Sequence, residues 1–191
     1  MSDHEDQSST NPAKPMATAT EVRKLADEGK KAFEAAKYEA AADLFARAAR
    51  GYADLKDKVN AAELRNNLSV ALLKLHKDQD ALDAALGTDE VFAGIRDARR
   101  QGMAIGNEAA ALENLGRLDE ALTAYERSAG LLADAGEGDL RALVLKAAAG
   151  IQLRRGKVTE SGIRMIGALE AKRHATIFER LLRFFVRIAP H

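Results

Sequence analysis

The stretch GRLDEALTAYERSAG, residues 116–130, repeats the order of small, large and charged side chains found in AKYEAAADLFARAAR, residues 36–50. The two stretches lie eighty residues apart, and half of that interval, forty residues, is the period of the whole middle of the chain. A period of this size is typical of stacked helical units, none of which buries its apolar face alone. The sequence therefore predicts an all-α array of repeated hairpins.

Aligned columns of residues carry this period. Small residues let two helix axes approach closely, and a bulky residue four positions later fills the space that opens one turn on. Three columns alternate along each unit between small residues and large or adaptable ones. The first, small column is Ala41, Ala81, Ala121 and Ser161; the second, large or adaptable column is Phe45, Ala85, Tyr125 and Met165; and the third, small column is Ala48, Thr88, Ser128 and Ala168. A fourth, small column holds Gly29, Ser69, Ala109 and Ala149, and an apolar column of Phe33, Leu73 and Leu153 is interrupted by Glu113.

Each unit is expected to hold two helices. First helices are predicted over residues 22–35, 62–75, 102–115 and 142–155, and second helices are predicted to begin near Tyr38, Asp78, Leu118 and Val158. Unit two matches the repeat pattern least well, because Ala85 and Thr88 stand where the pattern has a bulky residue and a small one. Thr18 and Glu21 form a candidate capping box, so the repeat domain is expected to begin at residue 18 and to end at residue 173.

The motifs resemble tetratricopeptide repeats over residues 21–172. The resemblance rests on residues 27–33 (DEGKKAF), followed by Tyr38-Glu39-Ala40-Ala41, and on GRLDEAL at residues 116–122, followed by Tyr125. Two features depart from the usual pattern: the period is 40 rather than about 34 residues, and Leu25, Arg65, Ile105 and Leu145 stand where Trp is usual. The longer unit is similar to those of kinesin light chains and related adaptors. The resemblance implies a right-handed α-solenoid of about four hairpins.

In this family the first helices line a concave groove that grips a peptide or a partner helix. The resemblance places in that groove Arg23, Lys30, Asn66, Asn67, Lys74, Asn107, Asn114, Lys146 and Arg154, together with Ala110 and Gly150. Asparagine can both donate to and accept from a peptide backbone, and the basic residues would favour an acidic partner. The alternative reading is an ordinary solvated helix face. Some members of the family hold the terminal carboxylate of a chaperone with a clamp of Lys, Asn, Asn, Lys and Arg. The corresponding positions here are Ala26, Lys30, Asn67, Met103 and Asn107. Only Asn67 agrees with the clamp, so this function is disfavoured.

The C-terminal segment, residues 174–191, is predicted to be a separate amphipathic helix. Between Thr176 and Ile188 its eight apolar residues cover about 200° of a helical wheel, twice the width that one neighbour requires. Four uses stay open: a cap on the last unit, a homodimer contact, a membrane contact, or occupation of the groove. Self-association or membrane contact would use Phe178, Leu181, Phe184 and Phe185.

Composition excludes several classes of function. Twenty-nine basic and 29 acidic residues give no net charge, which disfavours nucleic-acid binding. The chain has no cysteine, and its histidines His4, His76, His174 and His191 share no helix face, so neither a metal nor a cofactor is expected. The paired acids Asp119-Glu120 suit helix starts without any catalytic role. We therefore expect no enzymatic activity.

Residues 1–17 are polar, carry two of the three prolines and show no helical period, so they are predicted to form a disordered tail. They lack the pattern of a secretory signal, and no apolar run is long enough to span a bilayer, so a cytoplasmic protein is expected. Together these observations predict a non-enzymatic scaffold or adaptor that binds a peptide or helix in its groove. The alternative is a self-associating or membrane-peripheral structural protein that acts through the C-terminal helix.

Overall fold

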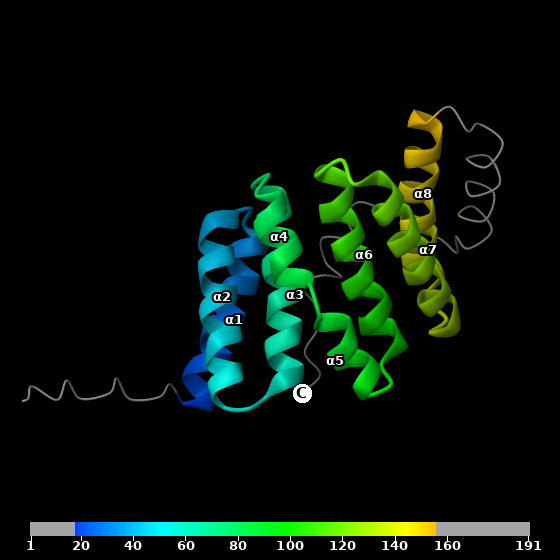
Figure 1. Cartoon of the computed structure of the whole chain (residues 1–191). Helices are drawn as coiled ribbons and strands as arrows, with labels where there is room; N and C mark the ends of the chain where they lie inside the picture. Colours follow the sequence, from blue (N-terminus) through cyan, green and yellow to red (C-terminus); the bar gives the residue numbers. More distant parts are fainter. Residues whose placement is uncertain (1–17, 156–191) are drawn as a thin grey trace, which may run out of the picture.

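The computed structural model describes residues 18–155, and within them every regular element is an α-helix. The helices stack side by side along the chain (Figure 1). Their bounds are α1 (Ala19–Glu34), α2 (Tyr38–Asp54), α3 (Lys58–Lys74), α4 (Asp78–Ala85), α5 (Thr88–Gly94), α6 (Ala98–Asn114), α7 (Leu118–Asp134) and α8 (Gly138–Arg154). None of these helices has both the length and the hydropathy that a membrane crossing would need.

The predicted hairpins are present. Helices α1, α3, α6 and α8 are the expected first helices, and each begins three or four residues before its predicted start. The second helices α2, α4 and α7 begin at the predicted residues Tyr38, Asp78 and Leu118. The second helix expected from Val158, the tail at residues 1–17 and the C-terminal helix at residues 174–191 lie outside the described residues.

The turns between helices follow one geometry. The second residue after α1, α2, α3, α5, α6 and α7 adopts a left-handed conformation, with φ between 56° and 76°, and these residues recur every twenty positions: Ala36, Lys56, His76, Arg96, Gly116 and Gly136. A left-handed residue closes a helix by turning its next amide back toward the last free carbonyls. After the turn, Asp57 and Asp97 cap α3 and α6 by accepting from backbone amides three residues on. The predicted capping box of Thr18 and Glu21 is also formed.

The second helix of unit two is broken, which the repeat pattern does not predict. Leu86 and Gly87 separate α4 from α5, and Gly87 has a φ of 75°. The side chain of Arg65, on α3, donates to the carbonyl oxygens of Asp83 and Leu86 at 3.1 and 2.8 Å. These carbonyls lie at the end of α4 and lack helical partners, so Arg65 satisfies them from the neighbouring helix.

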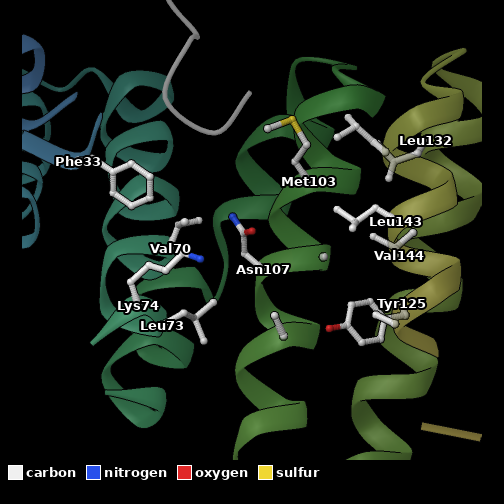
Figure 2. A pocket seen from close by; sticks show the side chains of 14 residues that line it. Phe33, Val70, Leu73, Lys74, Met103, Asn107, Tyr125, Leu132, Leu143 and Val144 are labelled. Atoms are coloured by element: carbon white, nitrogen blue, oxygen red, sulfur yellow. The ribbon is translucent and has the colours of Figure 1, made fainter. Parts of the chain in front are cut away.

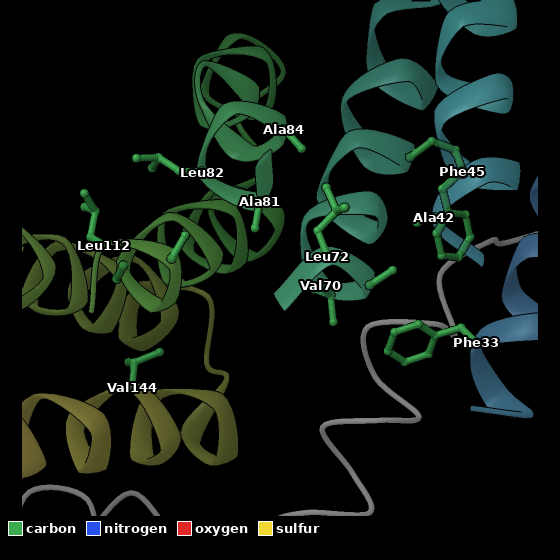
Figure 3. Close-up of a cluster of buried hydrophobic side chains, with 14 of the residues drawn as sticks. Phe33, Ala42, Phe45, Val70, Leu72, Ala81, Leu82, Ala84, Leu112 and Val144 are labelled. Carbon is green, nitrogen blue, oxygen red and sulfur yellow. The ribbon is translucent and has the colours of Figure 1, made fainter. Parts of the chain in front are cut away.

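The core contains members of the predicted columns together with other apolar residues of the helices (Figure 3). Ala41, Ala81 and Ala121 are completely buried, and Phe45 and Tyr125 pack one turn beyond the first and third of them. The expectation that Gly29 allows close packing is also confirmed, because a Cβ atom there would lie 2.7 Å from the ring of Phe45. Burial decreases along the apolar column that starts at Phe33. Phe33 is buried, Leu73 is half-buried and Leu153 is exposed.

Candidate functional site

A groove of about 300 Å³ lies between the first helices of three successive units. Figure 2 shows Val70 and Leu73 of α3 on one side, Asn107 of α6 at the centre, and Leu143 and Val144 of α8 beyond it. Phe33 of α1 and two residues of α7 complete the wall. The groove is lined by Phe33, Val70, Leu73, Lys74, Met103, Gly106, Asn107, Ala110, Tyr125, Leu132, Leu140, Leu143, Val144 and Ala147.

The lining is mainly apolar. Lys74 and Asn107 are its clearly polar side chains, together with the phenol of Tyr125, and none of the lining residues is a carboxylate. A concave apolar wall with few polar groups is the usual chemistry of a binding site, because burial supplies affinity and the polar groups fix orientation. The groove therefore suits apolar side chains better than it suits an extended backbone alone.

The forty-residue period builds this wall. Met103 and Leu143 occupy one column of the repeat, Val70 and Ala110 a second, and Asn107 and Ala147 a third. Equivalent positions of successive first helices thus form rows that run across the units. Sequence reasoning named Asn107 and Ala110 of these rows and missed the other apolar members. The same spacing carries the signal that would have identified them.

Gly106 lines the groove where α6 meets α7 and α8. A Cβ atom at this position would lie 3.3 Å from Oγ of Ser128 and 3.5 Å from Cγ1 of Val144. The first contact is tight and the second is ordinary van der Waals contact, so an alanine would require a small shift of Ser128. The glycine also leaves the backbone of α6 open to the groove that it lines.

Three of the eleven residues expected in the groove line it, namely Lys74, Asn107 and Ala110. The amide groups are less accessible than the sequence suggests, because Asn66, Asn67 and Asn107 are all buried. Nδ2 of Asn107 donates to Oδ1 of Asn66 at 3.4 Å, and the hydroxyl of Thr88 lies 3.3 Å from the same oxygen. Asn66 thus serves the contact between units two and three.

Two further expected groove residues also link successive units. Asn114 of α6 donates to Asp78 of α4 at 2.8 Å. Arg154 of α8 pairs with Glu113 of α6, whose other oxygen accepts the phenol hydrogen of Tyr125 at 2.9 Å. Burial, reinforced by the charge of Glu113, raises the pKa of Tyr125 far above its usual range. Glu113 therefore interrupts the apolar column because it joins three helices.

The remaining basic residues are dispersed. Arg23 on α1 and Lys146 on α8 are exposed, whereas Lys30 is half-buried. Burial raises the pKa of the nearby Glu63 carboxyl, although the charges of Lys30 and Arg100 oppose this shift. Glu63 also accepts a hydrogen bond from Arg100 at 3.4 Å. The basic set is thus distributed along the first helices and does not form one continuous patch.

A second, shallower hollow of about 390 Å³ lies between α6 and α7. Its rim carries Glu108, Asp119, Glu120 and Arg127. Burial, with a further contribution from the charge of Asp89, raises the pKa of Glu108, and Arg127 pairs with Asp89 at 2.9 Å. Across residues 18–155 no three His, Cys, Asp or Glu side chains are grouped closely enough to hold a metal ion.

The search of solved structures connects this arrangement with known folds. BtubC (BKLC) from P. vanneervenii matches with a TM-score of 0.70, covering 81% of this chain and 68% of that chain at 14% sequence identity. The fold is a tetratricopeptide-like helical repeat. MamA from AMB-1 also matches, at 19% identity, with 86% of this chain and 98% of that chain covered and a TM-score of 0.48. The sequence itself matches no protein-family model and no curated protein.

Proposed function

We propose that this tetratricopeptide-like chain is a non-enzymatic scaffold or adaptor that binds a segment of a protein partner in the groove. The observation that carries the proposal is the apolar wall formed by α3, α6 and α8. A soluble helix normally turns a polar face toward open space. Here three consecutive first helices place apolar side chains around one hollow, and such a surface is typical of a protein-interaction site.

The proposed ligand is an amphipathic helix or a short peptide with several apolar side chains. Its apolar residues would contact Val70, Met103 and Leu143, and Asn107 is the one amide of the lining that it could meet. Ordering a short peptide consumes much of the contact free energy, so we expect dissociation constants of about micromolar size. This ligand replaces the fully extended, backbone-held peptide as the favoured form, since Asn66 and Asn67 are buried.

An acidic character of the partner is the second element of the proposal. Lys74 lines the groove, and Arg23 and Lys146 lie exposed on the flanking first helices. A carboxylate on the partner would gain charge-assisted hydrogen bonds from such side chains. These exposed contacts would contribute less than the apolar ones, because water and salt screen them.

Capture of partners from a cell lysate tests the proposal. The bait is the full chain, compared with a variant carrying Ala110→Glu and Leu143→Glu, two half-buried groove residues. The matched control carries Leu86→Glu and Ala93→Glu, which add the same charges at exposed positions around α5. Circular dichroism and thermal unfolding first establish that all three chains are equally folded.

We expect specific partners to be retained by the wild type and by the control but lost from the groove variant. The captured segment is then mapped by limited proteolysis, and its apolar and acidic residues are tested with synthetic peptides. Identical partner lists for the groove variant and the wild type would refute the groove as the binding site. Partners that are lost equally from both variants would point to a general effect of added charge.

A further inference from the structure

We propose that residues 176–188 of this chain, TIFERLLRFFVRI, occupy the groove of the same molecule and thereby compete with its partners. The inference rests on the proposed function, because it concerns the regulation of the same site. The segment itself lies outside the described residues; its sequence, the groove and the length of the connecting chain support the inference. Each of these three points to the same occupant.

The chemistry of the groove matches that of the segment. The wall offers Val70, Leu73, Met103, Leu143 and Val144 and no carboxylate. The segment offers eight apolar residues among thirteen, with three arginines and one acid, Glu179, so the match is one of apolar surface and not of charge. If it binds as a helix, one half of its wide apolar arc can enter the groove while Arg180, Arg183 and Arg187 stay in water.

The dimensions also agree. A helix of thirteen residues is about 20 Å long at 1.5 Å per residue. The groove crosses from α3 over α6 to α8, and two interaxial distances of 8–10 Å likewise amount to about 20 Å. One such helix would therefore reach all three first helices.

The connection is long enough for this arrangement. The described chain ends at Arg155, directly after α8, and α8 itself contributes Leu143, Val144 and Ala147 to the groove. Twenty-one Cα steps separate Arg155 from Thr176, which allows about 70 Å when extended and about 30 Å when helical. Leu143 lies twelve residues before Arg155, or about 18 Å along the helix. Even a fully helical connection could span that distance.

Attachment to the same chain favours this occupant over a second copy. A short tether gives a bound segment an effective concentration of about millimolar. A second molecule at about micromolar concentration competes poorly against it. A micromolar intrinsic affinity would thus keep the groove mostly occupied in cis, and an external ligand would bind with an apparent affinity reduced by the free fraction.

The test uses Met103, the methionine of the groove lining, as a reporter. Methionine methyl groups are labelled with carbon-13 in the full chain, and a nitroxide is attached at Arg183→Cys, since the chain has no cysteine of its own. Arg183 belongs to the polar arc, so the label leaves the apolar residues intact. Asp43→Cys, at an exposed position of α2, provides the control label.

We expect the Arg183→Cys label to broaden the Met103 methyl signal strongly and independently of protein concentration. A mixed sample combines chains that carry only the carbon-13 methyl label with chains that carry only the nitroxide. This sample should show no broadening of the Met103 signal. In addition, full chains carrying Phe184→Ala and Phe185→Ala should bind a fluorescent peptide of residues 174–191 about tenfold more tightly than the wild type. Arg180→Ala with Arg183→Ala serves as the matched control and should leave peptide binding unchanged.

A Met103 signal that the Arg183→Cys label does not broaden would overturn the proposal, as would broadening of similar size in the mixed sample, which would identify a second copy as the occupant. The proposed function fails separately. If lysate partners depend on the groove but Met103 is unaffected, the groove binds partners and not its own segment. If Met103 is broadened while no partner depends on the groove, cis occupation stands without the adaptor role.

Discussion

Asn107 and Asn66, one repeat apart on α6 and α3, share a buried hydrogen bond of 3.4 Å between Nδ2 of the former and Oδ1 of the latter. The same oxygen lies beside the hydroxyl of Thr88, at the start of α5. Buried polar groups are costly unless they are paired, so this trio ties the broken helix of unit two to the groove wall. Changes within it should affect stability before they affect binding.

Replacing Thr88 by valine tests the trio. The hydroxyl donates its one hydrogen to the carbonyl oxygen of Ala85 at 2.6 Å and lies 3.3 Å from Oδ1 of Asn66, so Thr88→Val removes a polar neighbour from both oxygens and the hydrogen bond of the carbonyl. We expect a loss of about 1–3 kcal/mol in the free energy of unfolding, measured by urea denaturation. The control is Thr123→Val. The exposed hydroxyl of Thr123 donates to the Asp119 carbonyl, and its loss should change the free energy of unfolding by less than about 0.5 kcal/mol. Equal losses at both positions would contradict the assigned role.

Two glycine substitutions should have opposite signs. A Cβ atom at Gly29 would lie 2.7 Å from the buried ring of Phe45, so Gly29→Ala should destabilise the fold by about 1–3 kcal/mol. Gly130, inside α7, has open space around the same position, and Gly130→Ala should stabilise by about 0.5–1 kcal/mol. Thermal unfolding of both variants measures the difference. A stabilising Gly29→Ala would show that α1 and α2 do not need this close approach.

Glu63 makes stability depend on pH. Burial raises the pKa of its carboxyl, so the folded state holds this proton more tightly than the unfolded state does. The resulting contribution to stability is present at low pH and is lost as pH rises from the unfolded pKa through the folded one. Glu63→Gln removes this titration. The free energy of unfolding of the variant, measured by urea denaturation, should increase relative to that of the wild type from pH 4 to neutral pH. A difference between the two that does not change with pH would contradict the expectation.

The phenol of Tyr125 should resist ionisation. Its burial and the adjacent Glu113 both raise its pKa, and its hydrogen bond to Glu113 needs the protonated form. We expect tyrosinate absorbance in the near ultraviolet to increase for this residue only when alkali unfolds the chain. Comparison with Tyr125→Phe isolates its signal from Tyr38 and Tyr52, and the chain has no tryptophan to obscure it. That variant should also lose about 1–2 kcal/mol of stability.

The helices and their core columns were predictable because both follow from local periodicity. Ala41, Ala81 and Ala121 are small residues that are completely buried, and a forty-residue spacing suffices to align them. The break at Gly87 was not predictable in the same way. It depends on Arg65, which reaches the end of α4 from a position 21 residues before Leu86, and such a contact exists only after the helices have packed.

The candidate site divides along the same line. Periodicity places Asn66 and Asn107 on first helices, but it does not reveal that their amides are buried. A polar residue on a helix can face a partner, water or the next repeat, and only the rotation of neighbouring helices decides among these. The apolar groove residues Met103 and Leu143 were obscured for the related reason that an apolar position in a sequence is ordinarily assigned to the core.

The left-handed residues that end the helices at twenty-residue intervals have a consequence for how such a chain can grow. His76 and Gly116 stand at equivalent points of two turns, so the forty residues between them form an exchangeable module with matched ends. Each unit of a solenoid contacts chiefly its neighbours. Tandem duplication of that module would therefore insert another hairpin and lengthen the groove, and the existing contacts between units would be preserved. Evolution could thus lengthen the ligand that this protein accommodates in steps of one hairpin.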